Sequence, residues 1–347
     1  MKTISTKIVK GLFTAAFALV ATTTFAQEEE LETKKAVSIG GTVDAYYRTQ
    51  LSAPDTSPQA TGSFGNQTGF ALGMANIIAS YEGAKTGAVA DLVFGPRGNE
   101  AILNNAAVNV NQLYAYWNVC ESVTLTAGRF NTFLGYEVIS PAANFNYSTS
   151  YLFNAGPFSH VGLKADFALS EDFSLMLAVM NVNDIDNNAT GNATVVPGAY
   201  SLGAQLGYAG QFLNFIYDGE ANLGFEVDYT GGFDVSEDFF LGINAAYANN
   251  DGVGFYGAAL YPQFATSDDL TIGLRGEFFG TYDDIDATDD ATIFGLTLTG
   301  SYTIENLMIK PELRLDSASN DIFTDNDGAL LSTKSLSTFA IAAIYSF

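Results

Sequence analysis

Charged side chains recur two residues apart in several stretches of this chain of 347 residues. Lys310, Glu312 and Arg314 alternate with apolar residues, and Arg275 and Glu277 have the same spacing. Residues two apart on a β-strand point to one face, so each stretch predicts a charged face backed by an apolar one. Such a face can select ions at close range. We place twelve charged residues on these faces: Asp44, Arg48, Arg129, Lys164, Asp166, Glu226, Asp228, Arg275, Glu277, Lys310, Glu312 and Arg314.

Catalytic chemistry has little support in the sequence. His160 is the only histidine, so a Ser-His-Asp relay would have to use it. The adjacent Ser159 cannot join it, because neighbouring side chains on a strand point to opposite faces. We therefore expect no catalytic residue, and we interpret His160 as an inward side chain that hydrogen-bonds to a neighbouring loop.

Metal chemistry also has weak support. Cys120 is the only cysteine, which excludes an internal disulfide and a cysteine-based metal cluster. The acidic clusters at 184–188, 283–290 and 321–327 do not match a full calcium-binding loop, so we interpret them as solvated loops. We expect no metal site and no cofactor, and we leave open divalent-ion bridges from these loops to lipopolysaccharide.

The N-terminus has the layout of a secretory signal peptide: a basic start, an apolar run at 11–20 and a small-residue cleavage site near Ala26. The apolar run of about ten residues is too short to span a bilayer as a helix. Without residues 1–26, 11 basic residues face 38 acidic ones, for a net charge of −27, which makes nucleic acid an improbable partner. The expected division is a signal peptide (1–26), a periplasmic N-terminal segment (27–35) and a membrane domain (36–347).

The composition predicts how these elements meet a membrane. The chain is 48% apolar and only 15% charged, yet beyond residue 26 no apolar stretch approaches the ~20 residues of a transmembrane helix. A transmembrane β-barrel resolves the contradiction, because its strands need apolar residues only at alternate positions. We therefore predict an all-β, antiparallel transmembrane barrel in the outer membrane of a Gram-negative bacterium, and no helix.

The alternation recurs often enough to count strands. We expect about sixteen, wide enough for an aqueous channel, joined alternately by short periplasmic turns and longer extracellular loops. The even number would place both ends of the barrel in the periplasm. The predicted starts lie near 36, 69, 87, 108, 123, 159, 173, 199, 211, 222, 238, 252, 270, 291, 306 and 335.

The last strand carries a specific signal. Phe339, Ile341, Ala343 and Tyr345 occupy alternate positions, which we expect to face outward, and the chain stops at Phe347. A terminal aromatic residue after such an alternation resembles the end strand that barrel-insertion machinery recognises. We expect that machinery and outer-membrane lipids to be partners of the chain.

The longest link, 132–158, is the third outer loop. It is rich in aromatic residues and asparagine and contains one charged residue, Glu137, which suits a segment packed inside the lumen. We favour infolding that narrows the pore, and an extracellular cap is the alternative. The residues expected at this constriction are Glu137, Asn144, Asn146, Tyr147, Tyr151, Phe153 and His160.

Three segments resemble the OmpL-like family of β-barrel porins, common in Bacteroidota: AGRFNTFLGYE at 127–137, NFNYSTSYLF at 144–153 and GPFSHVG at 156–162. The family combines a Gly-Arg/Lys-Phe strand end, an Asn and Tyr-Ser loop and a Pro-Phe-x-His-Thr-Gly return. Here Val161 replaces the usual Thr, and Phe133 stands where Pro is common. The sharp match covers about forty residues, and it implies a channel of unassigned substrate.

Two functions from different classes follow as expectations. The first is an outer-membrane porin for passive diffusion of small hydrophilic solutes or ions, with cation preference from its acidic loops. The second is a structural or adhesive barrel with a closed lumen and acidic loops that bind a partner. An outer-membrane hydrolase is a weaker third, because no triad is in place. A homotrimer is left open, since no sequence feature tests it.

Overall fold

The computed structural model describes residues 36–61, 64–102, 109–182, 199–218, 223–284 and 290–347. The predicted signal peptide, the segment 27–35 and the acidic cluster at 184–188 lie outside these residues. The strands in the described part are β1 (Ala36–Gln50), β2 (Gly69–Glu82), β3 (Thr86–Phe94), β4 (Val110–Cys120), β5 (Val123–Asn131), β6 (Ser159–Ala168), β7 (Phe173–Asn181), β8 (Tyr200–Tyr208), β9 (Gln211–Asp218), β10 (Gly224–Asp234), β11 (Phe239–Asn250), β12 (Val253–Ala265), β13 (Leu270–Asp283), β14 (Ala291–Ile304), β15 (Leu307–Ala318) and β16 (Ser335–Ser346).

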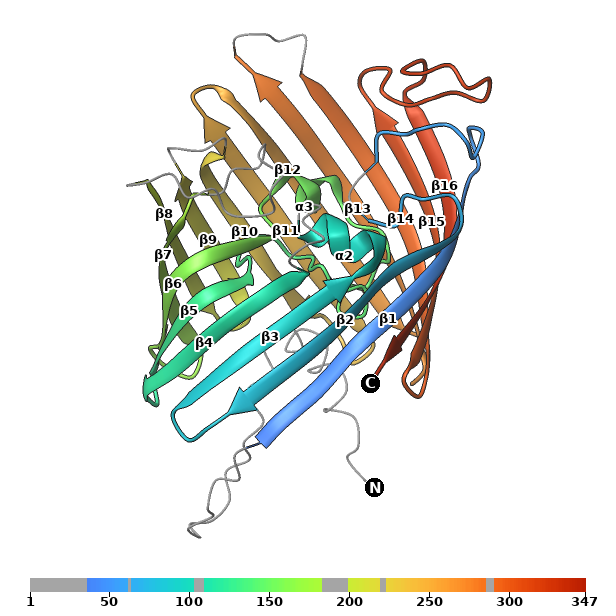
Figure 1. The fold of residues 1–347 in the computed structure, drawn as a ribbon. Coiled ribbons are helices and arrows are strands. Elements are labelled where there is room, and N and C mark those ends of the chain that lie inside the picture. The colour runs from blue at the N-terminus through green and yellow to red at the C-terminus, as the bar shows by residue number, and fades with distance from the viewer. Residues whose placement is uncertain (1–35, 62–63, 103–108, 183–198, 219–222, 285–289) are drawn as a thin grey trace.

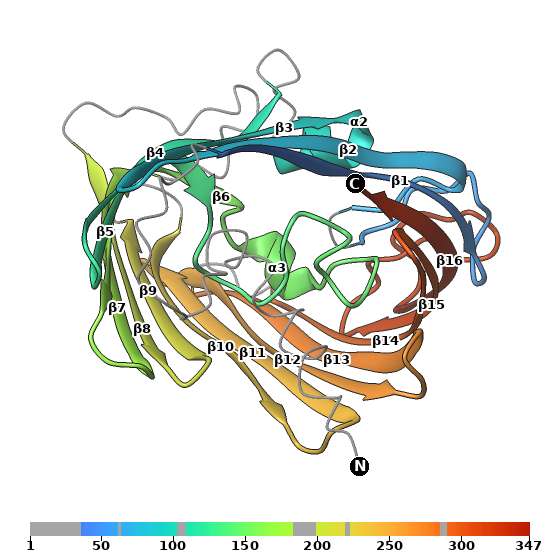
Figure 2. The ribbon, with the colours of Figure 1, turned by 90° about the horizontal axis from the view of Figure 1, so that it is seen from below.

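These sixteen strands form one closed barrel in which every strand pairs with its sequence neighbours. The ring closes where β1 pairs antiparallel with β16, from Thr42 opposite Ser346 to Gln50 opposite Thr338 (Figure 2). Closure leaves no unpaired edge, which a backbone surrounded by hydrocarbon requires. The sixteen-strand prediction is confirmed, and each predicted start lies within two residues of the observed one.

The alternation in sequence separates two surfaces of the wall. On β15, Leu313 and Leu315 are 37% and 45% exposed on the outside, whereas Glu312 and Arg314 between them are 3% and 5% exposed on the inside. β15 therefore presents apolar side chains outward and charged ones to the lumen, as expected for a wall between lipid and water. On other strands the inward face also contains apolar side chains, such as Met176 and Met180 of β7.

The connections at the two ends of the barrel differ in length. Links at one end are short, such as 121–122 between β4 and β5 and 209–210 between β8 and β9, while the longest link at the other end is 132–158 (Figure 1). Short turns on one side and long loops on the other are typical of outer-membrane barrels.

Two short helices correct the expectation that the chain has none: α2 (Gly95–Ala101) and α3 (Tyr151–Ala155). Both lie in long loops, where their few residues give no measurable periodicity. α3 is N-capped by Ser150, whose side-chain oxygen accepts the N–H of Phe153, and α2 has a proline in its first turn. Among the described residues, the structure contains no helix of the length and apolar character that a membrane crossing requires.

An apolar core lies inside the ring. Phe153, at the end of the third outer loop, stacks on Phe158 with ring centroids 5.0 Å apart and contacts Phe64 of the first loop at 5.9 Å. This cluster includes Val93 and Ile102 beside α2. The outer loops thus pack against one another within the barrel, and this packing positions the polar groups described next.

Candidate functional site

The loop 132–158 folds into the barrel, with α3 inside the ring of strands (Figure 2). At its base the Thr132 hydroxyl and His160 Nε2 are 2.9 Å apart. Three residues further on, the Gly135 N–H donates to Asp228 Oδ1 of β10 at 3.0 Å. His160 is fully buried and forms the contact to the loop that we predicted for it.

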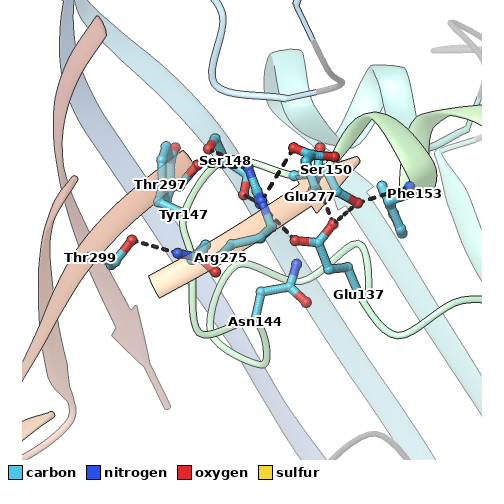
Figure 3. Close-up of polar contacts among 12 residues, drawn as sticks. Glu137, Asn144, Tyr147, Ser148, Ser150, Phe153, Arg275, Glu277, Thr297 and Thr299 are labelled. Atoms are coloured by element: carbon cyan, nitrogen blue, oxygen red, sulfur yellow. Dashed lines mark hydrogen bonds and ion pairs between the residues drawn. The ribbon is translucent and has the colours of Figure 1, made fainter. Parts of the chain in front are cut away.

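Arg275 of β13 forms the centre of the loop's attachment (Figure 3). Its Nη1 lies 2.7 Å from Glu137 Oε1 and donates to the Ser148 carbonyl at 2.6 Å. Its Nη2 donates to the Thr297 hydroxyl at 3.2 Å. A charge-assisted bond of this length is among the stronger contacts a protein makes, so one fully buried guanidinium ties both limbs of the loop to the wall.

Glu137 completes the same attachment from the loop side. Its Oε2 accepts both the N–H and the hydroxyl of Ser150, each at 2.6 Å. Because Ser150 also caps α3, the one charged residue of the loop connects that helix to Arg275. The glutamate singled out in the sequence therefore lies at the point where the loop meets β13.

A second arginine, Arg314 of β15, extends the network. Its Nε lies 2.9 Å from Asp316, its Nη1 donates to the Thr149 carbonyl at 2.8 Å, and its Nη2 lies 3.4 Å from Glu277 Oε1. Glu277 Oε2 accepts the Tyr151 N–H at 2.8 Å. Two arginines and three carboxylates thus form one buried ion network around the loop.

Further along the loop, Tyr147 is held from two strands. Its N–H donates to Glu312 Oε2 of β15 at 2.8 Å, and its hydroxyl donates to Asp44 Oδ2 of β1 at 2.6 Å. Burial and the Asp44 carboxylate raise the pKa of the Tyr147 hydroxyl well above its usual range, so it stays protonated and remains a donor. Asp44 sits at a register shift in β1, and its carboxylate occupies the space where a Cβ at Gly73 would lie.

Further contacts of the loop involve β14 and β15. Asn146 Nδ2 donates to the Thr299 hydroxyl at 2.7 Å. Lys310 is buried and donates to the carbonyls of Pro141, at 3.0 Å, and of Asn144. Asn144 in turn bonds back to Val138 within the loop. All seven residues predicted for the constriction are therefore brought together in or beside the infolded loop.

Sequence reasoning missed several residues of this site. Arg97 of α2 is 2% exposed and donates to the carbonyls of Ile139 and Tyr147, both at 3.0 Å, while it lies over the Phe64 ring. It stands in a Pro- and Gly-containing link with no alternation, so no local signal placed it inside. Thr297 and Thr299 could have been found, since they share the inward face of β14 with the residues opposite them.

Other predicted lumen residues form no ion pair with the network around Arg275 and Arg314 in the described part of the chain. Arg48 and Arg129 donate to the carbonyls of Asn66 and Asn111, at 2.8 and 3.1 Å. Lys164 pairs with Asp166 at 2.8 Å in a more exposed position. Glu226 and Asp228 line the wall at β10 and are both buried.

A small cavity lies beside Tyr147. Its volume is about 10 Å³, it lies between the loop and the wall, and its lining includes Arg48, Glu312, Arg314 and Asp316. That volume holds about one water molecule. Charges of both signs thus line this cavity.

The fold and this interior define the class of protein: a sixteen-stranded porin-type barrel with an infolded loop. Residues 36–347 match the family described as "Putative beta-barrel porin-2, OmpL-like". The chain therefore belongs to the OmpL-like family of β-barrel porins, as its sequence motifs indicated, and it is an outer-membrane protein. Among curated proteins, none matches the chain.

Solved structures share the fold at low sequence identity. The outer membrane channel DcaP of Acinetobacter baumannii has a TM-score of 0.58 at 14% identity, over 90% of this chain and 97% of that one. The anion-selective porin from Comamonas acidovorans has 0.60 at 10%, over 90% and 100%. The trimer form of in-vitro folded OmpT, an outer membrane protein of Vibrio cholerae, has 0.50 at 10%, over 90% and 99%.

Proposed function

We propose that this protein is a porin through which small hydrophilic solutes and ions diffuse passively, down their gradients, along a lumen that the loop 132–158 narrows. The single observation that carries the proposal is the attachment of that loop, inside a closed barrel, to Arg275 by a 2.7 Å ion pair with Glu137. A loop held inside a wall of this width restricts a passage without needing a moving part. Family membership supports the same function.

The twelve charged wall residues, together with the loop residues, are the proposed pore lining. Arg275 and Arg314 are paired with carboxylates, so they orient permeating dipoles while their own charge is largely compensated. Passive diffusion requires no catalytic residue and no cofactor. We therefore propose that the protein is not an enzyme.

Planar-bilayer recording tests this function. Purified protein added to one side of the bilayer should give stepwise increases in current, each from one insertion, with a roughly constant step size. Heat-denatured protein from the same preparation is the control. Native barrels, shown to be folded by heat-modifiable mobility in gel electrophoresis, that insert and give no steps would overturn the proposal.

The closed structural or adhesive barrel is the second candidate, and the close packing of the infolded loop against the wall through Arg275, Arg314 and Tyr147 favours it. If the lumen holds only isolated waters, the acidic outer loops would carry the function by binding a partner. The same recording separates the two candidates, because a closed barrel conducts no current.

Several finer points belong to the proposal. We propose a Bacteroidota origin, from the resemblance of three segments, cleavage near Ala26, and a periplasmic segment at 27–35. Barrel-insertion machinery would recognise β16 and Phe347, while lipid and lipopolysaccharide surround the wall. A homotrimer is consistent with the trimer form known for one structural relative.

A further inference from the structure

Two acidic side chains lie two residues apart on the inward face of β10. Glu226 is 3% exposed and Asp228 is 1% exposed. Both belong to the wall between β9 and β11, away from the ion network around Arg275. Since they share a face of one strand, they present two negative charges to the same part of the interior.

Asp228 accepts three hydrogen bonds, and its Oδ2 accepts only one of them. Its Oδ1 accepts from Asn214 Nδ2 at 2.7 Å and from the Gly135 N–H at 3.0 Å, and its Oδ2 accepts from Asn244 Nδ2 at 2.6 Å. Three N–H groups stabilise the ionised form of a carboxylate. These donors are two asparagine amides and one backbone N–H, and no basic side chain is among them.

Glu226 has the opposite surroundings. The residues directly across from it are Ile216 on β9 and Ala248 on β11, neither of which has a side-chain donor. Its Oε2 is buried and accepts no hydrogen bond. The charged group that acts on it is another carboxylate, that of Asp228. An ionised carboxylate buried in this way is strongly destabilised unless a cation joins it.

We propose that Glu226 and Asp228 form a cation site in the lumen wall that takes one hard divalent cation of the calcium type. One such cation cancels both charges and supplies the partner that Glu226 Oε2 lacks. Carboxylate and amide oxygens are the ligands such ions take, and water completes the shell. No group of three or more His, Cys, Asp or Glu side chains in the described part of the chain is placed to hold a metal. With two carboxylates alone, the cation is held weakly and exchanges with the lumen.

The site also touches the infolded loop, because Asp228 accepts the Gly135 N–H at the loop's base. A cation bound there lies beside the segment that narrows the lumen. The site rests on the geometry of the wall and does not require that the barrel conducts.

Calcium binding to the full chain tests the site. Purified protein in detergent is stripped with a chelator, and bound ⁴⁵Ca²⁺ is measured by equilibrium dialysis. The wild-type protein is expected to bind one more Ca²⁺ per chain than the Glu226→Gln variant. In that variant the affinity of the Glu226–Asp228 site for Ca²⁺ should fall at least tenfold. Asp228→Asn should lose the same site, which keeps the test usable if one variant does not fold. Heat-modifiable mobility checks folding of each variant.

The matched control is Glu237→Gln, which removes the same charge from an exposed turn between β10 and β11. It should keep the site that Glu226→Gln loses. Equal Ca²⁺ binding by the two variants would overturn the proposal and mean that Glu226 is buried as a neutral acid. If the Glu226-dependent site is found but the barrel passes no current, the proposed porin function is wrong and the cation site stands. If the barrel passes current but the site is absent, the cation site is wrong and the porin function stands.

Discussion

At the scale of single residues, the interior shows how a charge can be placed inside a barrel wall. Arg275 has no exposed surface, yet its guanidinium contacts Glu137 at 2.7 Å and lies 3.5 Å from Glu277 Oε1. The cost of removing these groups from water is offset only while all partners remain. Truncating one of them leaves an uncompensated buried charge.

Replacing Arg275 by Met should therefore lower the free energy of unfolding by about 3–5 kcal/mol, the usual cost of breaking a buried pair from one side. Urea unfolding in lipid vesicles, followed through Trp117 fluorescence, measures the change. Lys164→Met is the matched control: its pair with Asp166 is partly exposed, at 15% and 29%, so its loss should cost less than about 1 kcal/mol. Equal losses for the two variants would show that the Arg275 network adds no stability.

At the scale of elements, the sequence predicts the wall well and the path of the loop poorly. Period-two alternation is a local signal, so it sufficed for sixteen strands and for the inward face of residues such as Glu312. The pairing of Glu137 with Arg275 joins residues 138 positions apart, and no local pattern encodes it. The same holds for Arg97, whose helix is too short for periodicity, and for the register shift that places Asp44 beside Gly73.

The loop itself carries the next prediction. In a deletion variant, a short Gly-Ser linker replaces residues 138–152, which include Ser148 and Ser150, the residues that bind Arg275 and Glu137. The deletion removes Tyr147 and Asn146 from the lumen and frees the wall groups that now bind the loop. Single-channel conductance should rise severalfold above wild type.

The control for this deletion is Tyr147→Phe, which removes the hydroxyl that Asp44 accepts and keeps the loop in place. It should change conductance far less than the deletion does. A folded deletion variant with wild-type conductance would show that the loop does not limit the passage.

At the scale of the whole molecule, the arrangement of charge determines which ions the lumen favours. The chain carries 38 acidic residues against 14 basic ones. The lumen does not reverse this excess: Arg275 and Arg314 are paired with carboxylates, whereas Asp91 and Asp228 are hydrogen-bonded by asparagine amides and form no ion pair in the described part of the chain. A negative potential across the loops and the wall concentrates cations.

The barrel should therefore pass K⁺ more readily than Cl⁻. In a bilayer with a tenfold KCl gradient, the reversal potential should have the sign that results when K⁺ crosses more readily than Cl⁻ from the concentrated to the dilute side. Because the Debye length falls from ~10 Å at 0.1 M to ~3 Å at 1 M salt, the preference should weaken when both compartments are raised towards molar salt. A reversal potential of the opposite sign at low salt would show that the uncompensated basic groups, such as Arg48 beside the narrow cavity, govern permeation instead of the acidic excess.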